Sequence, residues 1–432
     1  MLGLAFAYLR DRALTTALNV LLLAIAVATL VLLLLFSTQI SQRFERDAQG
    51  IDLVVGAKGS PLQLILSSIY QIDNPTGNIP LESVAMLRRD PSVARAVPLA
   101  LGDNFRGFRI VGTEAAYLDI YGAKLAQGRL NAVDAEAVLG AAVARETGAK
   151  LGQKFLGSHG LGEDEGGSEH EHIPFTTVGI LKPTGTVIDR LIVTSVESVW
   201  DAHGIAHDDE HAKGGEQERG HGHEAEHDTG HAAEHDRGPA TSMSDAQGEM
   251  KPEVTALLVS YRNAYGAIRI PGMINRQTEL QAAVPAIETA RLLTLFGSAI
   301  DGARIFAWLL AATGGLAIFV ALLNAARARE GDLALLRVMG ASRTRVFGTI
   351  VLEGVLTAAA GALLGVLGGH LLLWLASRGF QTLSDLGLSA FVFHPGETAI
   401  VGGVLLIGVL AALIPAARVF RTDLAQTLAQ AS

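Results

Sequence analysis

The sequence of 432 residues contains no cysteine. Disulfides, iron–sulfur clusters, thiolate zinc sites and thiol nucleophiles are therefore excluded. The phosphate-binding pattern G-x-x-x-x-G-K-[ST] is also absent, so the chain cannot hydrolyse ATP by the route that uses this motif. The net charge of −9 gives no reason to expect nucleic acid as a partner.

Charge is almost missing from four long apolar segments, in which Glu353 and His370 are the ionisable exceptions. A helix needs about 20 apolar residues to cross the hydrocarbon core, and inside a bilayer the backbone must satisfy its own hydrogen bonds. We therefore predict a membrane protein with four transmembrane α-helices and a large α+β extracytoplasmic domain between helices 1 and 2. The first segment is longer than the apolar core of a signal peptide, which indicates an uncleaved anchor.

The predicted organisation follows the chain from an amphipathic leader to a polar tail. It consists of a cytoplasmic leader (1–16), transmembrane helix 1 (17–40), an extracytoplasmic domain (41–303) with mobile His-bearing insertions (157–172 and 201–248), transmembrane helix 2 (304–326), a cytoplasmic loop (327–345), transmembrane helix 3 (346–377), an extracytoplasmic loop (378–397), transmembrane helix 4 (398–417) and a cytoplasmic tail (418–432).

Basic residues in the short flanks predict the orientation. Arg10 and Arg12 precede the first span, five arginines lie in 327–345, and Arg418 and Arg421 follow the last span. Both termini and the arginine-rich loop are therefore expected in the cytoplasm. The large domain then lies outside the cytoplasm.

Apolar patterning within the large domain mixes strands and helices without regular alternation. The expected strands are 52–57, 95–101, 105–111, 175–180, 191–194 and 253–261, and the expected helices are 62–70, 81–89, 135–147 and 277–304.

Histidine is concentrated in the insertions, with eleven of the 13 histidines between His159 and His235. Several recur every fourth residue among acidic side chains, and imidazole with carboxylate suits zinc or another transition metal. The candidate ligands are His203, His207, His211, His221, His223, His227, His231 and His235. Glycines make this stretch flexible, so no tightly bound cofactor is expected. Zinc would bind only as the segment becomes ordered. A solvated low-complexity loop and a pH-responsive loop remain alternatives. His370 is expected to bond to a neighbouring helix.

The predicted cytoplasmic loop carries a short amphipathic pattern, Asp332-Leu-Ala-Leu-Leu-Arg337, which Gly340 would end. A rigid element held between two spans suits contact with a cytoplasmic partner. An ordinary charged membrane loop is the alternative.

These residues resemble the conserved region of MacB/FtsX/LolE-type ABC permeases. The resemblance rests on Asp332 to Ser342, on Glu353-Gly354 with the glycines that follow, and on Pro415-Ala-Ala-Arg418. The segments 138–143 and 178–183 are similar to the family's periplasmic core. Two positions depart from its pattern, since Asp332 stands where the family usually has Glu and Leu424 where it often has proline.

The resemblance implies a permease subunit that pairs with a second permease or a copy of itself and is driven by a separate ABC ATPase. It also implies a multi-pass protein of the bacterial cytoplasmic (inner) membrane, with the large domain periplasmic or extracellular. It places Asp332, Arg337, Gly340 and Arg343 at the ATPase-coupling surface. Together with the histidine-rich segment, this favours the hypothesis that the permease serves a process linked to a transition metal, most simply zinc. The alternatives are a mechanotransmitting permease for lipoprotein release or for efflux of a peptide or hydrophobic compound, and a non-transporting regulator of a cell-wall enzyme. Under these hypotheses, the partner outside the cytoplasm is expected to be a lipoprotein, a metal-binding protein or a membrane-fusion protein. The sequence offers no nucleophile–base pair that would predict an enzyme.

Overall fold

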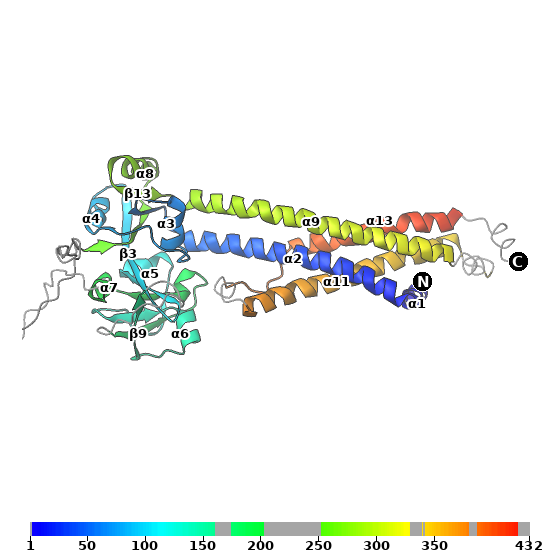
Figure 1. Cartoon of the computed structure of the whole chain (residues 1–432), viewed down its shortest axis with the longest axis horizontal. Helices are drawn as coiled ribbons and strands as arrows, with labels where there is room; N and C mark the ends of the chain where they lie inside the picture. The colour runs from blue at the N-terminus through cyan, green and yellow to red at the C-terminus, as the bar shows by residue number, and fades with distance from the viewer. Residues whose placement is uncertain are drawn as a thin grey trace, which may run out of the picture. The chain divides into compact units, whose positions relative to one another are not determined.

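The computed structural model describes residues 2–159, 174–202, 252–328, 339, 342–379 and 387–421. The chain divides into two compact units. We call Met1–Glu45 with Ala290–Ser432 the helical unit, and Arg46–Thr289 the α+β unit. Two helices, α2 (Ala13–Ala48) and α9 (Pro285–Ala328), contain residues of both units (Figure 1).

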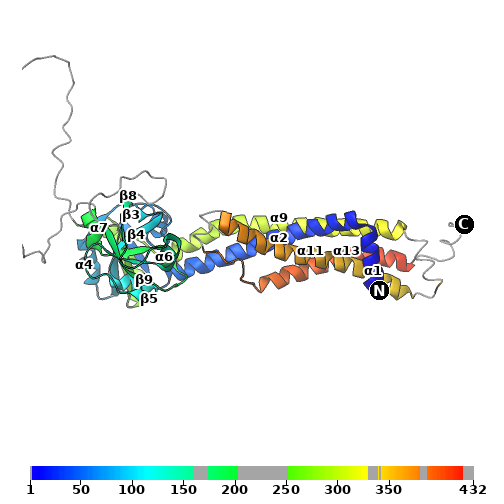
Figure 2. The same cartoon turned by 90° about the horizontal axis from the view of Figure 1, so that it is seen from below.

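The helical unit contains α1 (Leu2–Asp11), α2, α9, α11 (Arg343–Gly379) and α13 (Gly396–Arg421). Of these, α2, α9, α11 and α13 are long and apolar enough to cross a membrane, which confirms the four predicted spans. The short helix α1 is separated from α2 by a turn at Arg12 and lies at an angle to it (Figure 2).

Glycines of α11 allow close packing against α2. A Cβ on Gly361 would lie 2.7 Å from the Leu23 Cβ, and one on Gly365 would lie 2.8 Å from the Ala24 carbonyl oxygen. Gly369 meets Val31 in the same way, so three glycines spaced four residues apart form one face of α11. Small residues at such positions let backbones approach in membranes, where apolar burial provides little driving force between helices. The glycine-rich character of this span thus has a packing cause.

The α+β unit is a mixed sheet with helices packed against it. Its strands are β1 (Leu53–Ala57), β2 (Ile79–Pro80), β3 (Val93–Phe105), β4 (Phe108–Thr113), β5 (Leu125–Gly128), β6 (Glu136–Leu139), β7 (Lys154–Phe155), β8 (Ser158–His159), β9 (Phe175–Leu181), β10 (Ile192–Thr194), β11 (Glu253–Val254), β12 (Ala256–Tyr261) and β13 (Leu280–Ala283). Its helices are α3 (Pro61–Ser68), α4 (Glu82–Arg88), α5 (Ala115–Ile120), α6 (Ala141–Thr147), the 3₁₀ helix η1 (Val187–Arg190), α7 (Val196–Ala202) and α8 (Ala264–Gln277).

Within the described residues, the main sheet has the order β13-β1-β12-β3-β4-β10-β6-β9-β5, with β7 on β9 and β8 on β3, while β11 and β2 form a separate pair. Two apolar clusters fill the unit. One surrounds Leu53, Leu257 and Trp200, and the other surrounds Phe108, Phe155 and Phe175. The mixed α and β character expected of this domain is confirmed.

Three secondary-structure predictions are wrong. Residues 135–147 form β6 and then α6, because the run from Glu136 to Leu139 is a fully buried strand rather than a helical face. Residues 277–304 form β13 before α9 begins at Pro285, a residue suited to the first helical position. The strand expected over 105–111 is split by a turn in which Arg106 and Gly107 both have positive φ.

Candidate functional site

The predicted coupling residues fall mainly outside the described part of the chain. Asp332, Arg337 and Gly340 lie outside it, and Arg343 is described as the first residue of α11. The adjoining Ser342 caps this helix, because its Oγ accepts a hydrogen bond from the Arg345 N–H at 3.3 Å. Sequence reasoning did not single out Ser342 for this role, although a serine immediately before a helical pattern is a known start signal.

The ends of three helices that frame this segment are packed together. Ala326 near the end of α9, Val346 and Ile350 at the start of α11, and Ala416 near the end of α13 form one buried cluster. The adjoining ends of α9, α11 and α13 are therefore held together by one apolar cluster.

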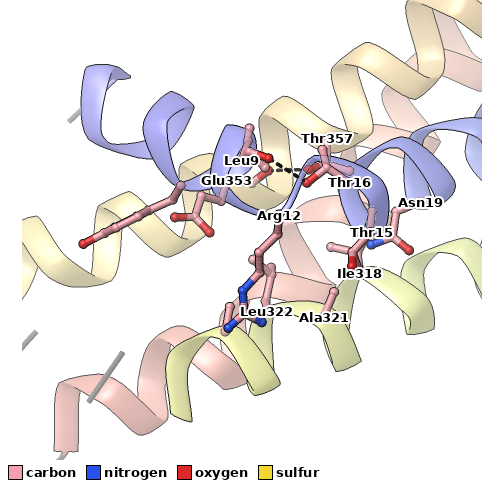
Figure 3. Close-up of a pocket in the computed structure, with 12 residues that line it drawn as sticks. Leu9, Arg12, Thr15, Thr16, Asn19, Ile318, Ala321, Leu322, Glu353 and Thr357 are labelled. Carbon is pink, nitrogen blue, oxygen red and sulfur yellow. Dashed lines mark hydrogen bonds between the residues drawn. The ribbon is translucent and has the colours of Figure 1, made fainter. Parts of the chain in front are cut away.

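A pocket lies beside the junction of α1 and α2, lined by residues of α1, α2, α9 and α11 (Figure 3). Arg12, Asn19 and Glu353 supply charged and amide groups, and Leu322 supplies part of the apolar wall. Glu353 is only 5% exposed. The Thr357 hydroxyl donates to the Glu353 carbonyl oxygen at 2.8 Å, a bond within α11.

At the opposite ends of α11 and α13, the half-buried His370 and the fully buried Glu397 form a polar pair. His370 Nε2 lies 3.0 Å from Glu397 Oε2, and His370 Nδ1 lies 2.6 Å from the Ala390 carbonyl oxygen. The other carboxylate oxygen of Glu397 accepts the His394 N–H at 2.8 Å. The prediction that His370 bonds to a neighbouring helix is confirmed. Its acidic partner was not predicted, although a Pro and a Glu just before an apolar run indicate a helix start.

Two further hydrogen bonds, both between Gln39 and Ser389, hold the chain before α13. Gln39 Nε2 of α2 donates to the Ser389 carbonyl oxygen at 2.9 Å, and the Ser389 N–H donates to Gln39 Oε1 at 2.8 Å. The segment from Ser389 to Glu397 is thereby tied to both α2 and α11. Three helices of the helical unit are locked together at this end.

In the α+β unit, buried polar groups fix the last residues of α2 and the first residues of α9. We call Asp47, Tyr70, Tyr121 and Thr289 the root cluster. Asp47, 2% exposed, accepts the Val187 N–H on Oδ1 at 2.8 Å, and the Tyr121 hydroxyl donates to the Asp47 carbonyl oxygen at 3.3 Å. The hydroxyls of Tyr70 and Thr289 are 2.6 Å apart.

The root cluster has a structural role. Burial raises the pKa of Tyr70 to about 12, despite the opposing effect of its bond to Thr289, so this phenol is neutral near pH 7. Burial likewise raises the pKa of Tyr121 well above its ordinary value. Neutral hydroxyls around one carboxylate hold position and do not exchange protons. The cluster therefore anchors α2 and α9 within the unit that they enter.

The predicted metal ligands cannot be placed. His203, His207, His211, His221, His223, His227, His231 and His235 lie outside the described residues, as does most of both insertions. Among the residues that the structure does describe, no group of three histidine or acidic side chains is arranged to hold a metal ion.

Comparison with known proteins identifies the two parts of the chain. Residues 16–213 match the MacB-like periplasmic core domain, and residues 304–424 match the FtsX-like permease C-terminal domain. No curated protein shows significant sequence similarity to the chain.

Two solved structures are similar to parts of it. The periplasmic region of MacB from Actinobacillus actinomycetemcomitans is 11% identical, with 57% of this chain and 95% of that chain covered and a TM-score of 0.32. The extracellular domain of the noncanonic ABC-type transporter YknZ from Gram-positive bacteria is 12% identical, with 54% and 98% covered and a TM-score of 0.29.

The two domain matches and the four spans together define a class of membrane protein. The chain is a permease of the MacB/FtsX family, a component of an ABC transporter.

Proposed function

We propose that the chain transmits the work of a separate ABC ATPase across the membrane to its α+β unit. The observation that carries this proposal is the continuity of α2 and α9, each of which holds residues of both units without a break. At 1.5 Å per residue, α2 is roughly 54 Å long and α9 roughly 66 Å, well beyond a hydrocarbon core of about 30 Å. Each helix can therefore span the bilayer and still act as a lever outside it.

The root cluster supports this transmission at the receiving end. A helix moves a domain only if its end is fixed in that domain, and Asp47 and Thr289 fix α2 and α9 through buried hydrogen bonds. Such bonds are costly to leave unmade, so movement of the helices displaces the sheet with them.

The ATPase docks on the loop at 327–345 in this proposal, with Asp332, Arg337, Gly340 and Arg343 at the contact. Both termini and this loop are cytoplasmic, and the α+β unit lies on the periplasmic side. The arginines that flank the spans support this orientation. The permease works as a pair, as a homodimer or with a second permease.

The hydrogen bonding of the polar groups in the spans favours transmission of movement over a hydrophilic pathway for a substrate. His370 and Glu397 are engaged with each other and with backbone groups, and so do not line an open path. Ionisable groups inside a membrane commonly mark conduction routes, but here the pair ties helices together.

The lack of cysteine permits a direct test. A spin label on Ile268→Cys, at a side chain of α8 that is 82% exposed, reports the separation of the α+β units in a permease pair. Trapping the ATPase with ATP and vanadate should shift this separation. Gln42→Pro, within α2, should abolish the shift while the ATPase stays bound, and Gln42→Ala should preserve it. An unchanged separation in the parent complex would refute the proposal.

We further propose that the process served is linked to zinc or another transition metal, through the histidine-rich segment at 201–248. The histidines spaced four residues apart support this assignment. Equilibrium dialysis with zinc should show binding that is lost when the eight candidate histidines become alanine. Loss of binding without any effect on growth in zinc-poor medium would favour lipoprotein release, efflux or regulation of a cell-wall enzyme instead.

A further inference from the structure

The charge pattern of the sequence indicates that the pocket at the junction of α1 and α2 lies level with the membrane interface. Arg12 is the last charged residue before a stretch without charge that runs from Ala13 to Gln42. A helix enters the hydrocarbon where its charges stop, so Arg12 sits at headgroup depth on whichever side of the membrane the N-terminus lies.

The two helices that meet at the pocket carry exposed apolar side chains. On α1 these are Leu2, Leu4 and Phe6, and on the first turns of α2 they are Leu14, Leu18 and Leu21. A helix with such side chains next to a span is suited to the boundary between headgroups and acyl chains. The helices on both sides of the pocket are therefore suited to contact lipid.

Polar residues of α2 and of the turn before it line the pocket. Thr15 and Asn19 are four residues apart, so they share one face of α2, and Arg12 lies in the turn that precedes this helix. They lie opposite apolar residues of α9, including Leu322 (Figure 3). Polar groups grouped on one face of a membrane helix need a polar partner.

Both signs of charge line this pocket. The Arg12 guanidinium is half-buried and has no ion-pair or hydrogen-bond partner within the described residues. Glu353 contributes a carboxylate from α11, and Figure 3 draws no bond between it and Arg12. A carboxylate has about four lone-pair positions, so Glu353 can accept from a ligand in addition to its protein contacts.

We infer that this pocket binds the headgroup of a zwitterionic aminophospholipid. The guanidinium of Arg12 takes the phosphate through paired N–H···O bonds, and Glu353 accepts hydrogen bonds from the primary ammonium. Thr15 and Asn19 donate to the phosphate or the ester oxygens, and the acyl chains lie along the exposed leucines of α2. An anionic lipid without an amine would instead bring its negative charge towards Glu353.

The test is native mass spectrometry of the full chain, delipidated in detergent and titrated with phosphatidylethanolamine, phosphatidylglycerol or phosphatidylcholine. The parent protein should retain phosphatidylethanolamine at least five-fold better than the other two lipids, because only its headgroup combines a phosphate with a hydrogen-bonding ammonium. Arg12→Gln should weaken this binding about ten-fold, and Arg12→Lys, which keeps the charge without the paired donors, by less. Arg10→Gln, which changes an exposed arginine outside the pocket, should leave it unchanged.

Further arms identify the source of the headgroup and the part played by the carboxylate. Inorganic phosphate and free phosphoethanolamine at millimolar concentration should displace little of the bound lipid. Glu353→Gln should remove the preference over phosphatidylglycerol. Equal binding of all three lipids by the parent protein, or equal losses in the Arg10 and Arg12 variants, would overturn the assignment. Gel filtration of each variant separates loss of the site from loss of the fold.

Discussion

His370 Nε2 and Glu397 Oε2 lie 3.0 Å apart and share a single proton. The Ala390 carbonyl oxygen can only accept, so His370 Nδ1 must donate to it and carries a hydrogen. The bond between Nε2 and Oε2 then holds the other hydrogen of the pair. Since Glu397 is fully buried, this bond and the bond from the His394 N–H satisfy both of its oxygens.

Removal of the carboxylate should therefore be costly, whereas its replacement by an amide should be tolerated. In Glu397→Gln the amide oxygen still accepts the His394 N–H and the amide nitrogen donates to His370. Glu397→Leu leaves both groups without a partner. We expect Glu397→Leu to lower the free energy of unfolding by about 1–3 kcal/mol and Glu397→Gln by less than about 1 kcal/mol. Denaturation by sodium dodecyl sulfate measures both, and equal losses would contradict the proton assignment.

The contact of α11 with α2 should not accept a methyl group. A Cβ on Gly365 would lie 2.7 Å from Val27 Cγ1 and 2.8 Å from the Ala24 carbonyl oxygen, so Gly365→Ala must force the helices apart. We expect a loss of about 1–3 kcal/mol in the free energy of unfolding. Gly402→Ala in α13 is the matched control, because a Cβ there meets nothing within 4 Å. Its stability should be unchanged or slightly raised.

The root cluster should couple stability to transmission. Tyr70→Phe removes the hydroxyl that lies 2.6 Å from Thr289 Oγ1, and Asp47→Ala leaves the Val187 N–H without its acceptor. Each should cost about 1–3 kcal/mol, and both should reduce the ATP-driven change in label separation. Tyr265→Phe, at an exposed position on α8, is the control for Tyr70. A full response in the Asp47 variant would mean that α2 is held by other contacts.

Acid should weaken the α+β unit through Glu136. Hydrogen bonds from Arg129 lower the pKa of this carboxyl to about 2, and the Ala132 and Val133 N–H groups add to the effect. Because the folded pKa is depressed, the stabilisation is complete above the unfolded value of about 4.3 and is lost as pH falls towards 2. Glu136→Gln should flatten the dependence of the melting temperature on pH in this window. Glu279→Gln, at an exposed carboxyl, should retain it.

The spans and the mixed character of the α+β unit could be predicted because their signals are local. A charge-free window of about 20 residues has few interpretations, since burial of a charge in lipid is costly. The strand at Leu280–Ala283 was missed because its residues fit a helical pattern equally well, and its neighbour β1 lies far back in the chain. No local signal marks that pairing.

The candidate sites also differ in whether their signal is local in the sequence. His370 was recognised as a residue that needs a partner, because histidine is conspicuous in an apolar run. Asp47 was not recognised, because it follows polar residues and its partner Val187 is 140 residues away in the chain. Asp332, Arg337 and Gly340 rest on family resemblance and stay predictions.

The position of β1 in the sheet sets an order of assembly. This strand follows α2 directly, yet its two neighbours, β12 and β13, are made last in the α+β unit. During synthesis β1 therefore remains unpaired until nearly the whole unit has left the ribosome. Non-local pairing of this kind is slow and leaves strand edges exposed to aggregation. The edges of β1 thus stay exposed for most of the synthesis of the unit, and a ribosome that stalls before Leu280 leaves a sheet without its final strand.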